Sequence, residues 1–194
     1  MREVFDRLED TPEEHPLRET ETVYHGKIFD LVKDRFGYGD ENLVREYIRH
    51  PGAVAIVAVN GDGLIAVIDQ YRHPMRKRMW EIPAGLLDVP GEAPLDAARR
   101  ELAEETDLVA QEWTKLLTLD NSPGGSAETL HVDLATGVRP AGQRFDRQEE
   151  EADMAIGWAS LDTILDAILA SRVSNPSLLT GVLGYAAWLE RHRP

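Results

Sequence analysis

The chain has 194 residues, 42% of them hydrophobic, which is enough for one domain with a sizeable core. It has no cysteine, which excludes disulfides, thiolate zinc sites and a cysteine nucleophile and fits a reducing cytoplasm. The net charge of −14 repels nucleic-acid backbones, and no apolar run approaches the roughly 20 residues of a membrane span. The acidic start also lacks the apolar region of a signal peptide. We therefore expect a soluble, cytoplasmic protein that binds neither nucleic acid nor membrane.

The first quarter of the chain divides into two parts. Residues 1–17 are acidic and contain Pro12 and Pro16, so we expect a flexible arm. Residues 18–50 alternate apolar and polar positions, and the run 37–40, Gly-Tyr-Gly-Asp, predicts a hairpin turn between short strands. This segment is too short to fold alone. It must therefore pack on residues 51–194 or on a second subunit.

Residues 51–194 alternate strand-like and helix-like patterns. Apolar runs bounded by turns predict strands at 52–60, 64–72, 79–87, 113–119, 128–136 and 154–158. A helical period predicts helices at 93–106, 161–169 and 177–191. The order predicts an α/β fold, with a mixed sheet between helices in an α/β/α sandwich.

The helix expected at 93–106 carries three carboxylates in five residues. Glu101 lies three residues before Glu104 and four before Glu105, so the pairs project from one side. Their repulsion costs helix stability, and a hard divalent cation such as Mg²⁺, which prefers oxygen ligands and substrate phosphates, removes that cost. The alternative is a solvated amphipathic helix, because the chain has 35 acidic residues.

The segment around these carboxylates resembles the Nudix box, Gly-x5-Glu-x7-Arg-Glu-apolar-x-Glu-Glu-x-Gly-apolar. The matching residues are Gly85, Glu92, Arg100, Glu101, Leu102, Glu104, Glu105 and Leu108. Two departures stand out: six residues rather than five separate Gly85 from Glu92, and Asp107 replaces the last glycine. That glycine ends the helix at a position expected to need positive φ, which aspartate tolerates.

Outside the box, the chain is similar to the ADP-ribose pyrophosphatase group of the Nudix family over roughly residues 20–185. The similarity lies in the runs 44–46, 50–54, 70–74, 80–86 and 122–128. It implies a Nudix-type α/β/α sandwich with a small N-terminal β segment. It also implies hydrolysis of ADP-ribose or another ADP-sugar to AMP and a sugar phosphate, with Mg²⁺ or Mn²⁺ as cofactor.

The resemblance assigns roles in catalysis. The metal ligands are expected to be the three carboxylates and the backbone carbonyl of Ala84. Arg100 is expected to hold the glutamates by ion pairing, and Glu92 and Glu81 to help position them. A later loop is expected to supply a glutamate as base, with Glu151 preferred over Glu150; a bare acidic loop is the alternative.

The resemblance also assigns substrate contacts. These are Arg45 and Arg72 on the phosphates, Phe29 on the adenine, Pro123 as the mark of ADP-ribose specificity with Gly124 beside it, and Glu128 near the terminal ribose. Each has a structural alternative. The arginines could form surface ion pairs, and Phe29 could pack in a core. Pro123 and Gly124 could lie in an ordinary loop, and Glu128 could be an exposed acid at the end of a strand. Arg76, Lys77 and Arg78 form a basic cluster, either a phosphate funnel or a solvated loop. Phe29 often comes from the other subunit in this group, which implies a homodimer with exchanged N-terminal strands.

Two other functions compete with this one. The chain could hydrolyse another nucleotide-sugar or a dinucleotide, or it could be a Nudix-fold sensor that binds ADP-ribose without cutting it. Pro123 and the 18–50 segment argue against the first function. The three retained glutamates argue against the second.

Overall fold

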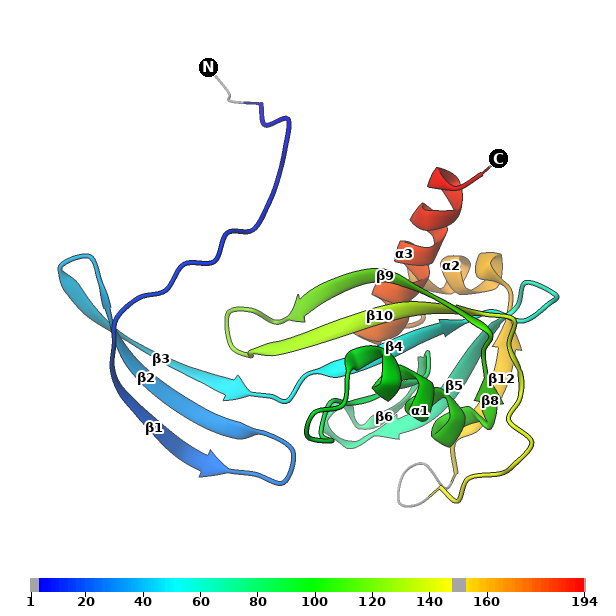
Figure 1. The fold of residues 1–194 in the computed structure, drawn as a ribbon, viewed down its shortest axis with the longest axis horizontal. Coiled ribbons are helices and arrows are strands. Elements are labelled where there is room, and N and C mark those ends of the chain that lie inside the picture. Colours follow the sequence, from blue (N-terminus) through cyan, green and yellow to red (C-terminus); the bar gives the residue numbers. More distant parts are fainter. Residues whose placement is uncertain (1–3, 148–152, 194) are drawn as a thin grey trace. The chain divides into compact units, whose positions relative to one another are not determined.

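The computed structural model describes residues 4–147 and 153–193, and it divides into two compact units after Arg49 (Figure 1). The smaller unit is a three-stranded antiparallel sheet in the order β1-β2-β3. Its strands are β1 (Leu17–His25), β2 (Asp30–Tyr38) and β3 (Glu41–Arg49). The turn between β2 and β3 contains Gly39 at φ 58°, within the run where a hairpin was predicted. Residues 26–29 form a second turn that the sequence pattern did not reveal.

The larger unit contains a mixed four-stranded sheet in the order β7-β4-β10-β9. Strand β4 (Ala53–Ala58) runs parallel to β10 (Glu128–Thr136) and antiparallel to β7 (Ala84–Leu86), and β9 (Glu112–Asn121) completes the sheet. An antiparallel sheet, β12-β5-β6, contains Ala155–Ala159, Ile65–Arg72 and Lys77–Glu81. A short pair joins β8 (Leu108–Val109) to β11 (Arg139–Pro140), and the 3₁₀ helix His73–Met75 links β5 to β6.

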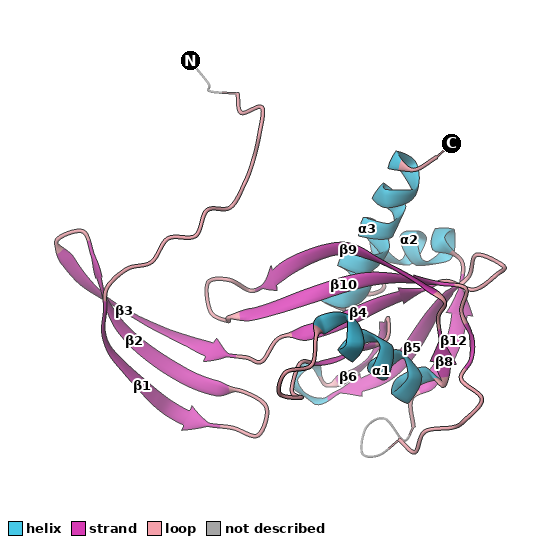
Figure 2. Ribbon diagram, in the orientation of Figure 1, coloured by secondary structure: helices cyan, strands magenta, loops and turns pink. Residues whose placement is uncertain are grey.

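Helices α1 (Pro94–Thr106) and α3 (Pro176–Arg191) pack on the mixed sheet and α2 (Leu161–Leu169) packs on α3, and the ends of these helices follow from local sequence (Figure 2). Helix α1 has proline in its first turn, where no backbone N–H is required. The side chains of Ser160 and Asn175 cap α2 and α3. Among the described residues, no helix is both long enough and apolar enough to cross a bilayer.

The core has two layers that meet at β4. Alternate β4 residues face opposite sides, because side chains alternate along a strand. Ala55 and Val57 pack with Leu178 and Val182 of α3, whereas the intervening side chains pack under α1 with Ala98, Leu102 and their neighbours. All six residues of β4 are buried. The predicted α/β/α sandwich is therefore confirmed.

The prediction of one continuous strand at 79–87 is wrong. The segment forms two strands, β6 and β7, which belong to different sheets. Pro83 lies between them, lacks the N–H that a continuing ladder requires, and accepts a hydrogen bond from Ile56 N–H through its carbonyl at 2.8 Å. This break carries the chain from one sheet to the other just before the predicted site.

Candidate active site

The strand β7 and the helix α1 form the frame of the site. Gly85 lies against the side chain of Glu101 so closely that an added Cβ would fall 1.9 Å from the Glu101 carboxyl carbon. Any larger residue at 85 would displace this carboxylate. The box glycine is therefore required by a close approach, since Gly85 has no positive φ.

Arg100 lies at the centre of the carboxylate cluster. Its Nε and Nη2 donate to the two carboxylate oxygens of Glu92 at 3.1 and 2.9 Å. Its Nη1 donates to Glu101 at 2.6 Å and to Glu104 at 3.1 Å. One guanidinium thus joins the loop before α1 to two carboxylates on the helix, a bond pattern that suits the planar fork of arginine.

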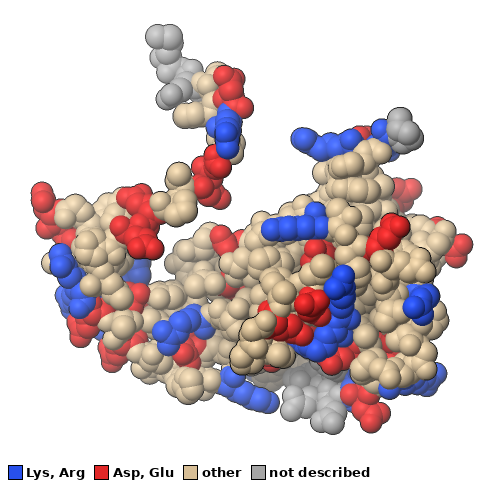
Figure 3. Space-filling model, in the orientation of Figure 1, with Lys and Arg blue, Asp and Glu red and all other residues tan. Residues whose placement is uncertain are grey.

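The electrostatics of the cluster follow from these contacts. Burial raises the pKa of Glu101 despite the opposing effect of Arg100. The hydrogen bonds from Arg100 lower the pKa of Glu92, and the same paired contact raises the pKa of Arg100. Arg100 therefore remains a fixed positive charge among the carboxylates. Figure 3 shows acidic and basic side chains side by side on the drawn face, despite the net charge of −14.

Glu105 lies deeper than the other two helix carboxylates, with 4% of the residue exposed. Its Oε2 accepts a hydrogen bond from the backbone N–H of Ala84 at 2.8 Å. This contact ties the last turn of α1 to the first residue of β7. It also places the Ala84 peptide beside the helix.

The donor set fits a hard divalent cation by its chemistry. Glu101, Glu104 and Glu105 supply carboxylate oxygens from one side of α1, and Ala84 supplies a backbone carbonyl at the strand beside Glu105. Within residues 4–147 and 153–193, no three acidic or histidine side chains form a ready metal cluster. Glu101 and Glu104 pair instead with Arg100. Binding a cation therefore requires these two carboxylates to share or exchange Arg100.

Asp107 ends α1 in the left-handed conformation, with φ 56°, as the replaced glycine led us to expect. Its carboxylate accepts the backbone N–H of Phe145 at 2.8 Å and lies 2.8 Å from Arg147 Nη2. Desolvation raises the pKa of Asp107, but these two partners outweigh it, so the pKa lies below the ordinary value. Asp107 thus contacts a segment almost forty residues away, which the box pattern did not predict.

Arg72 makes a paired contact with Glu81 of the adjacent strand. Its Nε donates to Oε1 at 2.8 Å and its Nη2 to Oε2 at 2.6 Å. Glu81 is 1% exposed, whereas the Arg72 side chain is 42% exposed. Arg72 therefore forms an ion pair, as the structural alternative expected, but its partner Glu81 is buried. Part of the Arg72 side chain is still exposed to solvent.

The loop that joins β9 to β10 contains the other predicted contacts of the larger unit. Pro123 and Gly124 lie in an exposed turn, with Ser122 at φ 56°, and an added Cβ at Gly124 would meet no atom within 4 Å. Glu128 is half-buried and begins β10. A Cβ at Gly52 would contact both Leu87, just after β7, and Thr129 of β10. The start of β10 is therefore close to the end of β7.

The remaining predicted residues lie elsewhere. Phe29 is in the turn between β1 and β2 and is 42% exposed, so it does not belong to a core within its own unit. Arg45 of β3 is exposed, donates to the Val44 carbonyl at 2.9 Å, and has no ion pair with any described carboxylate. Glu150 and Glu151 lie outside the described residues.

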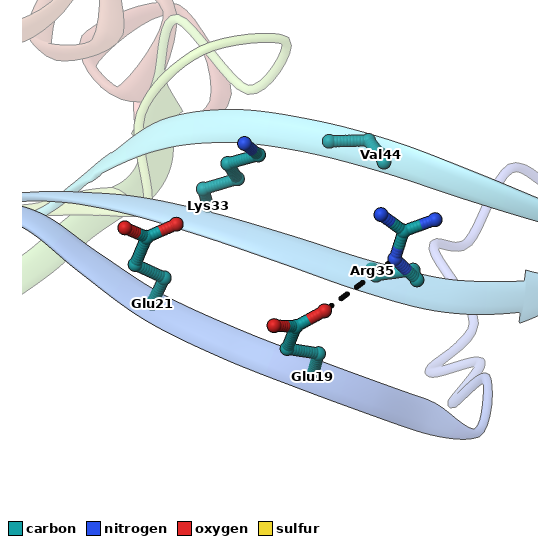
Figure 4. A pocket seen from close by; sticks show the side chains of 5 residues that line it. All are labelled: Glu19, Glu21, Lys33, Arg35 and Val44. Carbon is teal, nitrogen blue, oxygen red and sulfur yellow. Dashed lines mark ion pairs between the residues drawn. The ribbon is translucent and has the colours of Figure 1, made fainter.

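A hollow on the smaller unit does not include Arg45. Its lining residues are Glu19, Glu21, Lys33, Arg35 and Val44 (Figure 4). Arg45 follows Val44 and therefore points to the opposite face of the sheet. The lining charges are largely balanced, with Arg35 3.5 Å from Glu19.

The residues of the basic run 76–78 are all exposed, but Lys77 and Arg78 belong to β6 and not to a loop. Arg76 adopts φ 55° after the 3₁₀ helix, and Lys77 donates to Ser174 at 2.8 Å. Arg78 binds both Asp69 and Asp153. Sequence reasoning missed Arg78 and Arg147 as anchors, because their partners are far away in the sequence and no local spacing marks them.

Comparisons with known proteins identify this arrangement. The NUDIX domain family model matches residues 49–177. The chain is 44% identical to an ADP-ribose pyrophosphatase of Mycobacterium tuberculosis, over 87% of this chain and 81% of that protein. It is 39% identical to an ADP-ribose pyrophosphatase of Bacillus subtilis, over 68% of this chain and 71% of that protein. A solved structure of an ADP compounds hydrolase superposes with a TM-score of 0.77 at 20% identity, covering 94% of this chain and 98% of that one, and so shares the fold.

Proposed function

The chain belongs to the Nudix family of hydrolases, and we propose that it hydrolyses the pyrophosphate of ADP-ribose to AMP and ribose 5-phosphate. The observation that carries the proposal is the packing of the carboxylate helix α1 against β7, with Glu101 on Gly85 and Glu105 on Ala84. The two relatives named as ADP-ribose pyrophosphatases support the choice of substrate. The turn with Pro123 and Gly124 supports it further, because it is exposed and comes before the start of β10, which lies close to the end of β7.

Mg²⁺ or Mn²⁺ is the proposed cofactor, held by Glu101, Glu104, Glu105 and the carbonyl of Ala84. When bound, such a cation neutralises charge on the pyrophosphate and lowers the pKa of a coordinated water. Arg100 keeps the carboxylates in place through Glu92, which ties the guanidinium to the loop before the helix. The proposed base that takes the proton of the attacking water is Glu151 or Glu150, outside the described residues.

Arg72 is the proposed phosphate contact of the larger unit. Glu81 fixes one edge of its guanidinium, so the exposed part is presented in a defined orientation. An arginine side chain that is partly exposed to solvent can make charge-assisted bonds to a phosphate oxygen. Glu128 is the proposed contact of the terminal ribose.

The smaller unit supplies the remaining proposed contacts. Phe29 is exposed and available to stack on the adenine, and Arg45 is available for a phosphate because no described carboxylate pairs with it. We propose that residues 18–50 are exchanged between two copies in a homodimer, with residues 1–17 as a flexible arm and residues 51–194 as the hydrolase domain. The exposed strand β1 supports this proposal, since its sheet lacks a core of its own. A cytoplasmic location is proposed from the absence of cysteine.

The first test is a substrate panel with Mg²⁺ and purified protein, with kcat/KM measured for ADP-ribose, other ADP-sugars, NADH and diadenosine polyphosphates. We expect ADP-ribose to lead by at least about tenfold, about 1.4 kcal/mol in transition-state stabilisation. A lead by another substrate would retain the fold and the carboxylate site but reject the roles of Pro123, Glu128 and Phe29.

The sensor alternative is tested with Glu104→Gln. In an enzyme this change removes turnover and leaves ADP-ribose binding measurable by calorimetry. Binding without cleavage by the unchanged protein would reject hydrolysis in favour of a sensor.

A further inference from the structure

The side chain of Gln70 in β5 is buried without a hydrogen bond to its amide oxygen. The residue is 5% exposed, and its Oε1 accepts no hydrogen bond from any described residue. Such an oxygen has lost its contacts with water on folding, and no protein donor replaces them. Native proteins pair the great majority of buried polar groups, so this exception calls for a ligand, a water or a functional role.

Gln70 differs from the other residues that have unpaired buried polar atoms. The described residues include two such others, Asp34 and Arg147. Asp34 accepts the Tyr47 hydroxyl through its second carboxylate oxygen at 3.0 Å, and a guanidinium nitrogen of Arg147 lies 2.8 Å from the carboxylate of Asp107. Each of these side chains therefore has a partner, whereas the Gln70 oxygen has none among the described residues.

Gln70 lies on the face of its sheet that carries Arg72 and Glu81. Residues two apart along a strand point to the same side, so Gln70 and Arg72 share a face. On β6, Met79 lies opposite Gln70 and Glu81 lies opposite Ile68, and residues directly opposite one another also share a face. The unpaired amide therefore belongs to the same surface of the sheet as the proposed phosphate contact.

The contact between Arg72 and Glu81 brings the arginine past Gln70. Arg72 lies opposite Lys77, yet its guanidinium binds Glu81, four residues further along β6, at 2.8 and 2.6 Å. The row formed by Gln70 and Met79 is midway between these two positions. To reach Glu81, the Arg72 side chain must therefore pass the level of Gln70.

The chemistry of an amide oxygen decides which part of a nucleotide-sugar it can bind. The oxygen only accepts hydrogen bonds. Phosphate groups joined in a pyrophosphate are ionised near neutral pH and also only accept, so they suit the arginine and not the amide oxygen. Hydroxyl groups donate, and each phosphate of ADP-ribose is esterified to a ribose that carries them. A guanidinium with an acceptor beside it thus matches two neighbouring parts of one substrate.

We propose that Gln70 is a specificity-determining residue, whose amide oxygen accepts a hydrogen bond from a ribose hydroxyl of the substrate beside the phosphate that Arg72 holds. This inference rests on the proposed hydrolysis of ADP-ribose and on Arg72 as its phosphate contact. Because Oε1 has no bond to a described residue, turning it toward the hydroxyl breaks none at that atom. Ile68 and Met79 are buried on the same face, and their apolar surroundings strengthen such a bond.

The variant Gln70→Met tests this role, because its effects on stability and on activity should differ in sign. Methionine is unbranched like glutamine but has no amide, so it removes the unpaired oxygen. We expect the melting temperature to stay equal or rise. With ADP-ribose and Mg²⁺, we expect kcat/KM to fall about tenfold, because the ribose hydroxyl loses its acceptor. Gln111→Met, at an exposed position after β8, is the matched control and should change neither quantity.

Substrate analogues that lack one ribose hydroxyl show whether the loss is specific. In the unchanged protein, removal of the bound hydroxyl should lower kcat/KM about tenfold, whereas in Gln70→Met the same removal should change it less than about twofold. Analogues deoxygenated in the adenosine ribose test one source of the hydroxyl, and analogues deoxygenated in the terminal ribose test the other. Additive losses for every analogue would overturn the proposal. An unchanged kcat/KM in Gln70→Met would also overturn it and leave the amide to a buried water.

Calorimetry separates this inference from the proposed function. If the unchanged protein binds ADP-ribose without cutting it, hydrolysis is rejected, but the dissociation constants of the unchanged protein and of Gln70→Met still test the hydrogen bond. Binding that is about tenfold weaker in Gln70→Met would support the role of Gln70, and equal binding would overturn it. Absence of both binding and cleavage in the unchanged protein would reject the proposed function and this inference together.

Discussion

The strands β4 and β1 show how differently the two units are stabilised. All six residues of β4 are buried between α1 and α3, whereas all nine residues of β1 are exposed. The smaller unit buries few side chains, Val32 being its fully buried hydrophobic residue among those described. The larger unit therefore has a core of its own, and we expect a further surface to cover the β1-β2-β3 sheet.

This difference in burial suggests different roles for the two units. The larger unit holds the carboxylate helix on a packed core, which fixes side chains closely. The smaller unit carries Phe29 and Arg45 on exposed positions. Changes in the larger unit should affect folding or chemistry, and changes in the smaller unit should affect binding and assembly.

The largest effect is expected from Glu105→Gln in the larger unit. The amide keeps the shape and an acceptor for Ala84 N–H, but removes the charge that we propose to hold the cation. We expect kcat to fall about 10²- to 10³-fold, about 2.7–4 kcal/mol, with the melting temperature little changed. Steady-state kinetics with Mg²⁺ measure this. Glu21→Gln on the smaller unit is the control, and an equal loss there would contradict a specific role for Glu105.

Next in size is Ile56→Ala in β4. Ile56 is fully buried beneath α1, so truncation leaves a cavity in the layer that contains Leu102. We expect the free energy of unfolding to fall by about 3 kcal/mol. Urea denaturation measures this change. A loss below about 1 kcal/mol would show that the layer relaxes around the cavity and that the two units differ less than their burial implies.

A smaller effect is expected from Arg45→Ala in the smaller unit. If Arg45 contacts a phosphate, KM for ADP-ribose should rise about tenfold, about 1.4 kcal/mol, with stability unchanged. Arg45→Lys keeps the charge but not the paired bonds, so its KM should lie between that of the unchanged protein and that of Arg45→Ala. Arg35→Ala, on the opposite face of the same sheet, is the control. Equal KM values for both alanine variants would remove Arg45 from the site.

The smallest effect is expected from Val23→Ala in β1. Val23 is 50% exposed, so in dilute protein the free energy of unfolding should change by less than about 0.5 kcal/mol. If a second copy covers this strand, the loss should grow with protein concentration. Thermal melts across a concentration series measure both. A concentration-independent loss above about 1 kcal/mol would place Val23 in a core within one chain.

Local sequence predicted the helices closely. The predicted helix 93–106 is Pro94–Thr106, and 161–169 is unchanged, because capping residues and a 3.6-residue period act within a few turns. The apolar run 52–60 likewise predicted a strand, which the structure shows as β4, Ala53–Ala58. The break at Pro83 was missed, because proline is also common at the ends of strands and only the pairing of Ile56 with Pro83 showed which case applied.

What the sequence by itself determined is therefore local: the spacing of Glu101, Glu104 and Glu105 on one helix, and the left-handed end at Asp107. The family itself followed from this spacing, since the box is a single continuous segment. Only the tertiary structure decided the partners of Arg72, Arg78 and Asp107, because these depend on strand register and on chain returning from far along the sequence. Gly85 belongs to the box pattern that the sequence shows, but only the structure explains why glycine is required there. A side chain at 85 would collide with the carboxylate of Glu101 on α1.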